Sequence, residues 1–286
     1  MRRALPYLLF LLLLAVSGCA DKQTHLERRP KFYKTIISLS PSTSEIVASC
    51  GDINTLKGRT AACNYPQNMM NPIPIVCYVK PDFEKIASIK PDLILYDTDL
   101  IGPQDIDKLK STKADFFAID AETVDSYVKE LFEMGSKLGW ETRFNDYVIR
   151  IQSEKSAASA SPFTPVPKVA IVLPGNTGDD YICGVDGFLG DVVKICGGQI
   201  VGPKGTKFVP LNAEAFVALN PDVIVVGGSK TDTTEPSLVM ADPRFKTVSA
   251  VKQGRVKAMN SDVLLRRGQR VDELIKAIHA LIAPNK

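Results

Sequence analysis

Two segments of this chain, 130 residues apart, carry the same arrangement of residues. In each segment a helix-capping residue stands two positions before a glutamate, and an aromatic residue stands six positions before that glutamate. Pro-Asp follows the glutamate by seven positions, directly before a run of branched apolar residues. The matching residues are Tyr78 and Phe208, Asp82 and Asn212, Glu84 and Glu214, Pro91-Asp92 and Pro221-Asp222. Because one domain usually takes about 100–150 residues, such a repeat in a chain of 286 residues predicts two similar lobes.

The apolar pattern predicts strands that alternate with short helices. The expected strands are 34–39, 93–96, 115–119, 169–173, 223–226 and 256–259, and the expected helices include 44–50, 105–110, 187–195 and 271–282. Ser42 followed by Glu45 matches a capping box at the start of the first helix. The alternation favours an α/β fold of two Rossmann-like lobes, each with a parallel sheet covered by helices.

Apolar residues recur at three- and four-residue steps from Glu122 to about Ser159, which predicts the longest helical segment of the chain, with a kink near Gly139-Trp140. A helix bends less easily than extended crossover strands, so large hinge motion between the lobes is not expected. The predicted organisation is a signal peptide at 1–18, a tether at 19–32, an N-terminal lobe at 33–120, a connecting helix at 121–160 and a C-terminal lobe at 161–286.

The first residues have the features of a secretion signal. Arg2 and Arg3 precede a short apolar stretch, and Val16-Ser17-Gly18-Cys19 closes it. That stretch is shorter than the roughly 20 apolar residues that a membrane span needs. A site of small residues ending in cysteine resembles the bacterial lipobox, in which Cys19 would be acylated; the alternative is an ordinary cleavage site with a chance cysteine. We expect a lipid-anchored protein in the periplasm or on the outer face of the cytoplasmic membrane.

The charge balance argues against nucleic acid as a partner. Removal of residues 1–18 lowers the number of Lys and Arg from 35 to 33, against 32 Asp and Glu, and leaves a net charge of +1. A nucleic-acid-binding surface is normally strongly basic.

The residue types and their spacing give little support for catalysis or for metal binding. The two histidines are His25, in the tether, and His279, in the final predicted helix, so no cluster of imidazole ligands or histidine base is expected in a cleft. The glycine-containing segments 184–187 and 202–205 lack the P-loop spacing, and no Gly-x-Ser-x-Gly elbow is present. We therefore expect no catalytic residues, no metal site and no resident cofactor.

Six cysteines leave five after acylation of Cys19, an odd number in a compartment that permits disulfides. Cys63 and Cys77 flank a loop rich in Pro and Asn, and are the candidate disulfide.

The chain resembles the substrate-binding proteins of bacterial ABC importers for cobalamin, haem and ferric siderophores. The resemblance covers nearly all of the mature chain and rests on Ser38–Glu45, Asn64-Tyr65-Pro66, both Glu…Pro-Asp repeats, the central helix and Cys196-Gly197-Gly198. Tyr65-Pro66 and the loop that leads to the first repeat place it nearest the cobalamin-binding branch. The resemblance implies the helical-backbone (class III) periplasmic binding fold.

The same resemblance implies that Glu84 and Glu214 dock onto arginines of a permease dimer, which works with ATPase subunits. Early helical positions hold such carboxylates at the surface, and one per lobe suits a two-fold partner with paired cations. The alternative is that both glutamates only stabilise the starts of their helices.

The family's ligand contacts come from loops at the lobe interface, and the corresponding positions here are Tyr65, Tyr78, Asp97, Tyr181, Phe208, Asp262 and Arg266. Aromatic side chains suit a flat macrocycle. Where the cobalamin-binding pattern has tryptophans, this chain has Tyr78, Asp97 and Phe208. Packing in the core is the alternative role for each aromatic residue, and Arg266, Arg267 and Arg270 could bind an anionic ligand or simply be solvated.

Together these features predict a non-enzymatic, lipid-anchored receptor of an ABC importer. Its expected ligand is a metal chelate, a corrinoid such as cobalamin in the first place and a ferric siderophore or haem as the alternative.

Overall fold

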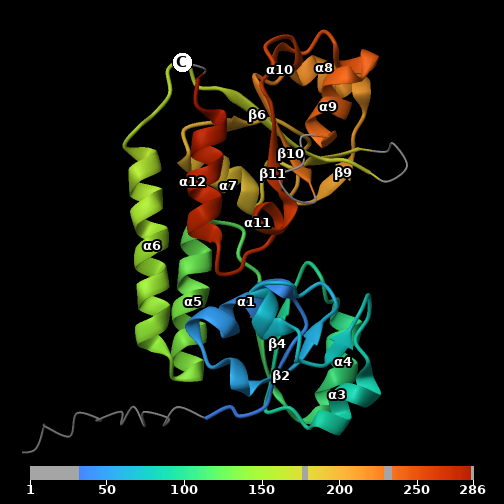
Figure 1. The fold of residues 1–286 in the computed structure, drawn as a ribbon, viewed down its shortest axis with the longest axis vertical. Helices are drawn as coiled ribbons and strands as arrows, with labels where there is room; N and C mark the ends of the chain where they lie inside the picture. Colours follow the sequence, from blue (N-terminus) through green and yellow to red (C-terminus); the bar gives the residue numbers. More distant parts are fainter. Residues whose placement is uncertain (1–31, 176–179, 229–233, 285–286) are drawn as a thin grey trace, which may run out of the picture.

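The computed structural model describes residues 32–175, 180–228 and 234–284. Within them, two α/β lobes lie one above the other along the long axis, and a column of helices runs along one side (Figure 1). The expected signal peptide, Cys19 and all of the tether but its last residue lie outside the described residues. None of the helices described here is both apolar enough and long enough to cross a membrane.

The N-terminal lobe is built on a five-stranded parallel sheet with the order β3-β2-β1-β4-β5, which matches the first five strands of the Rossmann order 3-2-1-4-5-6. Its strands are β1 (Ile36–Ser38), β2 (Leu56–Thr60), β3 (Ile75–Cys77), β4 (Leu93–Asp97) and β5 (Asp115–Ile119). Its α-helices are α1 (Pro41–Cys50), α2 (Gln67–Met70), α3 (Phe83–Ile89) and α4 (Pro103–Leu109), with 3-10 turns at Ile53–Thr55 and Lys110–Thr112.

The C-terminal lobe has a mixed sheet with the order β11-β10-β6-β7-β9, and β8 pairs with β6. Its strands are β6 (Lys168–Leu173), β7 (Tyr181–Cys183), β8 (Gln199–Ile200), β9 (Phe208–Pro210), β10 (Val223–Gly228) and β11 (Val256–Asn260). Its α-helices are α7 (Phe188–Ile195), α8 (Ala213–Leu219), α9 (Thr234–Ala241), α10 (Ser249–Lys252), α11 (Ser261–Leu265) and α12 (Val271–Ile282), with a 3-10 turn at Pro243–Phe245. This sheet is mixed where a parallel sheet was expected, because β7 runs antiparallel to both β6 and β9.

Alternating strand residues divide the core into layers. Val223 and Val225 of β10 belong to a hydrophobic cluster that also includes residues of α5 (Val124–Leu138), α6 (Glu141–Ser159), α12 and the N-terminal sheet. Ile224 faces the other side, in a separate cluster with Phe216 of α8. Because the first cluster runs through both lobes and the helical column, packing as well as covalent connection joins the lobes.

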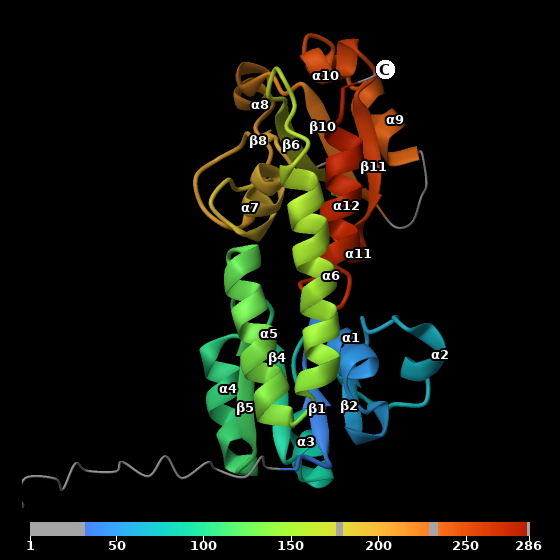
Figure 2. The same ribbon diagram turned by 90° about the vertical axis from the view of Figure 1, so that its left-hand side faces the viewer.

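The connection between the lobes is a helical hairpin in which α6 is the long spanning helix (Figure 2). The expected kink at Gly139-Trp140 is a full reversal of the chain. Gly139 ends α5 with a positive φ of 71°, which glycine adopts without strain, and Trp140 begins α6. An ion pair between Lys155, near the end of α6, and Asp125, near the start of α5, shows that the two helices are antiparallel.

The repeated segments adopt the same local structure in both lobes. Asp82 and Asn212 cap α3 and α8, each accepting a hydrogen bond from the backbone N–H three residues later, as predicted. Both helices end at a residue in the left-handed conformation, Lys90 or Asn220, immediately before the Pro-Asp pair.

Each aspartate of these Pro-Asp pairs then ties its repeat to the first strand of its lobe. The Asp92 carboxylate accepts hydrogen bonds of 3.0 Å from the N–H groups of Lys34 and Thr35, beside β1. The Asp222 carboxylate accepts one of 2.8 Å from Lys168 N–H, at the start of β6. The duplicated motif therefore ends a helix, and its aspartate fixes the position of the next strand beside the first strand of the lobe.

Candidate functional site

A short loop between α11 and α12, residues 266–270, extends from the C-terminal lobe and contacts the N-terminal lobe. We call it the arginine loop, because Arg266, Arg267 and Arg270 all lie on it. The hydroxyls of Tyr127 and Tyr147 each donate a 2.6 Å hydrogen bond to the backbone carbonyl of Gly268, so the helical hairpin holds the middle of the loop.

Glu45 of α1 is the central carboxylate of this contact. Its side chain is 1% exposed and lies 2.9 Å from Arg266 Nη1 and 2.7 Å from Arg270 Nη2. The capping box predicted for Ser42 and Glu45 was wrong, because the helix begins earlier: Ser40 is the N-cap and accepts a hydrogen bond from the N–H of Thr43. One turn into the helix, Glu45 points at the other lobe.

Arg267 makes a second set of bonds across the interface. Its Nη2 lies 2.6 Å from Asp97 Oδ1 and 2.7 Å from Asp99 Oδ2, and its Nη1 donates to the carbonyl of Ala121. Burial raises the pKa of the Asp97 carboxyl above its ordinary value, although the Arg267 charge acts in the opposite direction. Asp97 is 4% exposed, so the structure places it inside the interface and not on a free wall.

Tyr65 and Asp262, two further expected ligand contacts, also take part in this network. The Arg270 guanidinium lies 4.3 Å from the centroid of the Tyr65 ring, a cation–π contact. Asp262 accepts from Arg266 at 2.6 Å and from the side-chain amide of Asn64 at 2.8 Å. The structure thus places Tyr65, Asp97, Asp262 and Arg266 around the arginine loop, where Asp262 pairs with Arg266, Asp97 pairs with Arg267 and the Tyr65 ring lies against Arg270.

Next to the arginine loop, the two lobes enclose a cleft of about 320 Å³. Two residues predicted to bind ligand, Phe208 and Arg266, line it. Tyr78 and Tyr181 are 73% and 39% exposed and do not line it. Arg267, which was considered for an anionic ligand, also lines it. The other lining residues, not predicted as contacts, are Asp99, Leu100, Asp120, Glu122, Cys183, Gly187, Phe188, Leu189, Thr206, Lys207, Leu264 and Leu265.

The cleft has two chemically different walls. The N-terminal lobe contributes the carboxylates of Asp99, Asp120 and Glu122, whereas the C-terminal lobe contributes mainly apolar side chains such as Phe188 and Leu264. The sequence held a signal for the acidic wall: Asp99 and Asp120 follow the carboxyl ends of β4 and β5, where open α/β sheets bind ligands.

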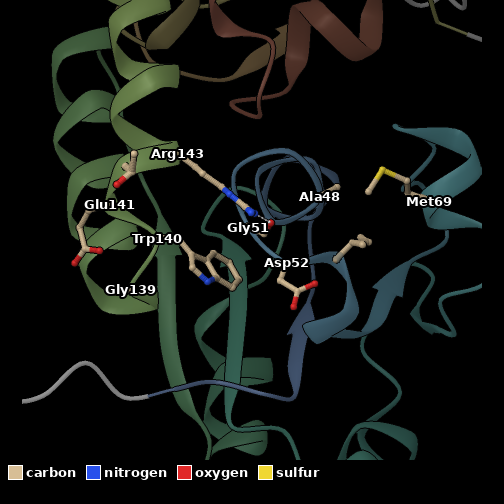
Figure 3. Close-up of a pocket in the computed structure, with 10 residues that line it drawn as sticks. Ala48, Gly51, Asp52, Met69, Gly139, Trp140, Glu141 and Arg143 are labelled. Carbon is tan, nitrogen blue, oxygen red and sulfur yellow. Dashed lines mark hydrogen bonds between the residues drawn. The ribbon is translucent and has the colours of Figure 1, made fainter.

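A second cavity, of about 460 Å³, lies on the flank of the N-terminal lobe beside the turn between α5 and α6 (Figure 3). The Trp140 indole and the Arg143 side chain reach across it toward Gly51, whose carbonyl accepts a hydrogen bond from Arg143. None of its lining residues also lines the cleft between the lobes.

The two glutamates of the repeat lie on the surface. Glu84 in α3 and Glu214 in α8 are both exposed. Figure 1 shows α3 and α8 at opposite ends of the long axis, both on the side of the molecule away from α5 and α6.

The candidate disulfide is not formed in the structure. Cys63 and Cys77 are free and buried. The Cys63 sulfur instead lies 3.0 Å from Ser44 Oγ and 3.2 Å from Thr60 Oγ1, inside a polar cluster at the start of α1. Among the residues that the structure covers, no group of three or more His, Cys, Asp and Glu side chains could hold a metal ion.

Comparison with known proteins identifies the class to which this fold and cleft belong. Residues 36–263 match the model of the periplasmic binding protein family, so the chain belongs to that family. It is accordingly a substrate-binding protein of an ABC importer, acts outside the cytoplasm and is not an enzyme.

Individual relatives are distant. An uncharacterised ABC transporter substrate-binding lipoprotein of Bacillus subtilis (strain 168), YvrC, is 25% identical over 276 residues, covering 94% of this chain and 85% of the relative. The vitamin B12-binding protein BtuF of Vibrio cholerae has a similar fold, with a TM-score of 0.73, 19% identity and coverage of 87% of this chain and 96% of that one. A periplasmic haem-binding protein from Pseudomonas aeruginosa matches with a TM-score of 0.74 and 20% identity, over 89% and 94% of the two chains.

Proposed function

We propose that this protein is a lipid-anchored receptor, acylated at Cys19, that binds a corrinoid such as cobalamin in the cleft between its lobes. It then delivers the ligand to an ABC permease dimer through Glu84 and Glu214. Relatives that are named for vitamin B12 and for haem leave the ligand open between these two classes. The chemistry of the cleft favours the first.

The choice of a corrinoid over an anionic chelate rests on the partners of the arginines beside the cleft. Haem propionates and most ferric siderophores are anionic, and proteins hold such groups with arginine or lysine. Here Arg266, Arg267 and Arg270 are already paired with carboxylates. Lys207 is the cleft cation for which no ion pair is found among the described residues.

The acidic wall suits a ligand surface that carries hydrogen-bond donors and no negative charge. The periphery of a corrinoid carries uncharged amide groups, whose N–H bonds are donors for the carboxylates of Asp120 and Glu122. The apolar wall, with Phe188 and Phe208, suits the macrocycle itself. A corrinoid is larger than about 320 Å³, so we expect one edge to enter the cleft. The rest would lie at the mouth, against the exposed side chains of Leu100 and Leu265.

Calorimetric titration of the purified protein with cyanocobalamin, haemin and a ferric siderophore tests this choice. Saturable binding of cyanocobalamin alone is the expected result, with an affinity that falls at least about fivefold in the Phe208→Ala variant, since a ring in a ligand pocket contributes about 1 kcal/mol or more. Saturation by haemin or the siderophore, with no heat from cyanocobalamin, would assign the cleft to an anionic chelate instead.

The docking role rests on the duplicated glutamates. Two exposed carboxylates, one per lobe, belong to α3 and α8, and both helices lie on the side away from the helical hairpin (Figure 1). This arrangement supports docking onto a two-fold partner that offers paired cations. The glutamates are not needed as N-caps, because Asp82 and Asn212 already cap α3 and α8.

A further inference from the structure

The repeat holds a second matched position that the docking glutamates do not explain. A valine stands five residues before each glutamate, Val79 before Glu84 and Val209 before Glu214. Their side chains are 89% and 36% exposed. Neither valine belongs to a hydrophobic core cluster, so the meaning of the matched position depends on what surrounds it in each lobe.

In the N-terminal lobe this position forms a projecting tip. Cys77 and Pro81 face each other as an antiparallel bridge, and Asp82 N–H donates a 2.8 Å bond to the Val76 carbonyl. The chain between them must therefore turn sharply, and it places Tyr78 and Val79 at the turn with 73% and 89% of their surface exposed. We call these two residues the apolar tip. It precedes α3, whose first turn carries Glu84.

In the C-terminal lobe the same position borders a groove. β9, which contains Val209, is the edge strand of its sheet. Between β9 and α8 lies a groove of about 390 Å³ with mainly apolar walls that include Val209, Leu211 and Phe216. Pro210 lacks an N–H group and is unsuited to pairing with an added strand, so the groove is suited to a side chain rather than to a β-strand. It lies directly beside Glu214, since Ala215 is part of its wall.

We infer that the apolar tip and the α8 groove belong to the permease-docking surface, together with the glutamates that they adjoin. The partner is a permease subunit that presents an apolar side chain and an apolar recess next to its cations. This inference rests on the proposed docking role. It adds a contribution to the free energy of docking that does not depend on salt. Ion pairs between exposed groups weaken with salt, whereas burial of the tip and groove does not.

The test measures binding of the ligand-loaded protein to its permease–ATPase complex in nanodiscs, at low and at high salt. The variants are Val79→Ser at the tip and Ala215→Gln, which places a larger side chain in the groove. Each should weaken binding about tenfold at both salt concentrations, as expected for an apolar interface anchor. Glu84→Gln should instead weaken binding at low salt and flatten its salt dependence. Ile149→Ser, an exposed apolar residue on α6, is the matched control and should change nothing.

Three results separate the possibilities. Wild-type docking by Val79→Ser and Ala215→Gln, with a loss in Glu84→Gln, would overturn this inference and leave the docking role of the glutamates intact. Wild-type docking by all three variants would overturn both. A loss of cyanocobalamin binding in Val79→Ser, measured by calorimetry on a variant with unchanged melting temperature, would assign the tip to the ligand site and also overturn the inference.

Discussion

At the scale of single residues, Glu45 best shows how tertiary contacts can override a local pattern. Its distance from Ser42 fits a capping box, yet Ser40 caps the helix and Glu45 binds two arginines of the other lobe. The local spacing does not reveal this role, because the partners lie 221 and 225 residues further along the chain. By contrast, Asp82 and Asn212 could be predicted as caps, because a cap bonds only to its own helix.

Glu45→Gln is expected to destabilise the protein strongly. The variant removes the carboxylate that pairs with buried Arg270 and leaves Arg266 with Asp262 alone, and loss of one partner of a buried ion pair typically costs about 3–5 kcal/mol. Urea unfolding measures this directly. Asp107→Asn, which removes an exposed ion pair with Lys110, is the control and should leave the midpoint unchanged. Equal midpoints for both variants would show that the buried network contributes nothing to stability.

The buried cysteines predict that the free energy of unfolding depends on pH. Burial raises the pKa of Cys50 and Cys77 to about 11, and that of Cys183 and Cys196 to about 12, from an ordinary value of 9.0. Because only the unfolded thiols ionise near pH 9, their contribution to the free energy of unfolding is complete below pH 9. It is lost as the pH rises toward 11–12.

The same shifts predict slow reaction of these thiols with Ellman's reagent. At pH 8.5, less than roughly 1% of each native thiol is ionised, so the four should react only after urea is added. Fast modification of the native protein would contradict the burial of these side chains.

At the scale of elements, the repeat predicted the two short helices, their caps and the strands that follow, because each of these features depends on neighbouring residues. The strands β2, β3, β7, β8 and β9 could not be predicted in the same way. Each is two to five residues long, and the segments between the apolar runs carry no clear alternation. The reversal at Gly139-Trp140 also escaped prediction, because the helical periodicity continues on both sides of it.

The ends of α3 and α8 provide a matched pair of substitutions. Lys90 and Asn220 both adopt positive φ, at 54° and 44°, where glycine is free of strain. Lys90→Gly should therefore stabilise the protein by about 0.5–1 kcal/mol in urea unfolding. Asn220→Gly should stabilise it less, because the Asn220 side chain also accepts a 2.8 Å bond from Ser249 N–H. A larger gain from Asn220→Gly would mean that this bond contributes little.

At the scale of the whole molecule, the class of fold followed from the repeat and the long helical segment, whereas the chemistry of the cleft did not. Tyr65, Asp97, Asp262 and Arg266 were expected to bind ligand, and the structure uses them to hold the lobes together. Which polar group faces a ligand and which faces another lobe depends on the relative placement of the two sheets, and no local pattern encodes it.

The lobe interface also bears on how the receptor works. The ion pairs of the arginine loop, the hydrophobic cluster shared by both lobes and the helical hairpin all oppose a wide separation of the lobes. In the proposed docking, Glu84 and Glu214 would therefore keep a nearly fixed spacing, which suits a partner whose cations are themselves fixed by two-fold symmetry.

Uptake of radiolabelled cyanocobalamin by cells of the native bacterium that carry the Glu84→Arg, Glu214→Arg variant tests the central claim most directly. The account predicts normal binding by the purified variant, but uptake reduced at least about tenfold, since like charges then face each other across the docking surface. Glu141→Arg, an exposed acidic residue at the start of α6, should support normal uptake. Full uptake by the double variant would contradict delivery through the paired glutamates.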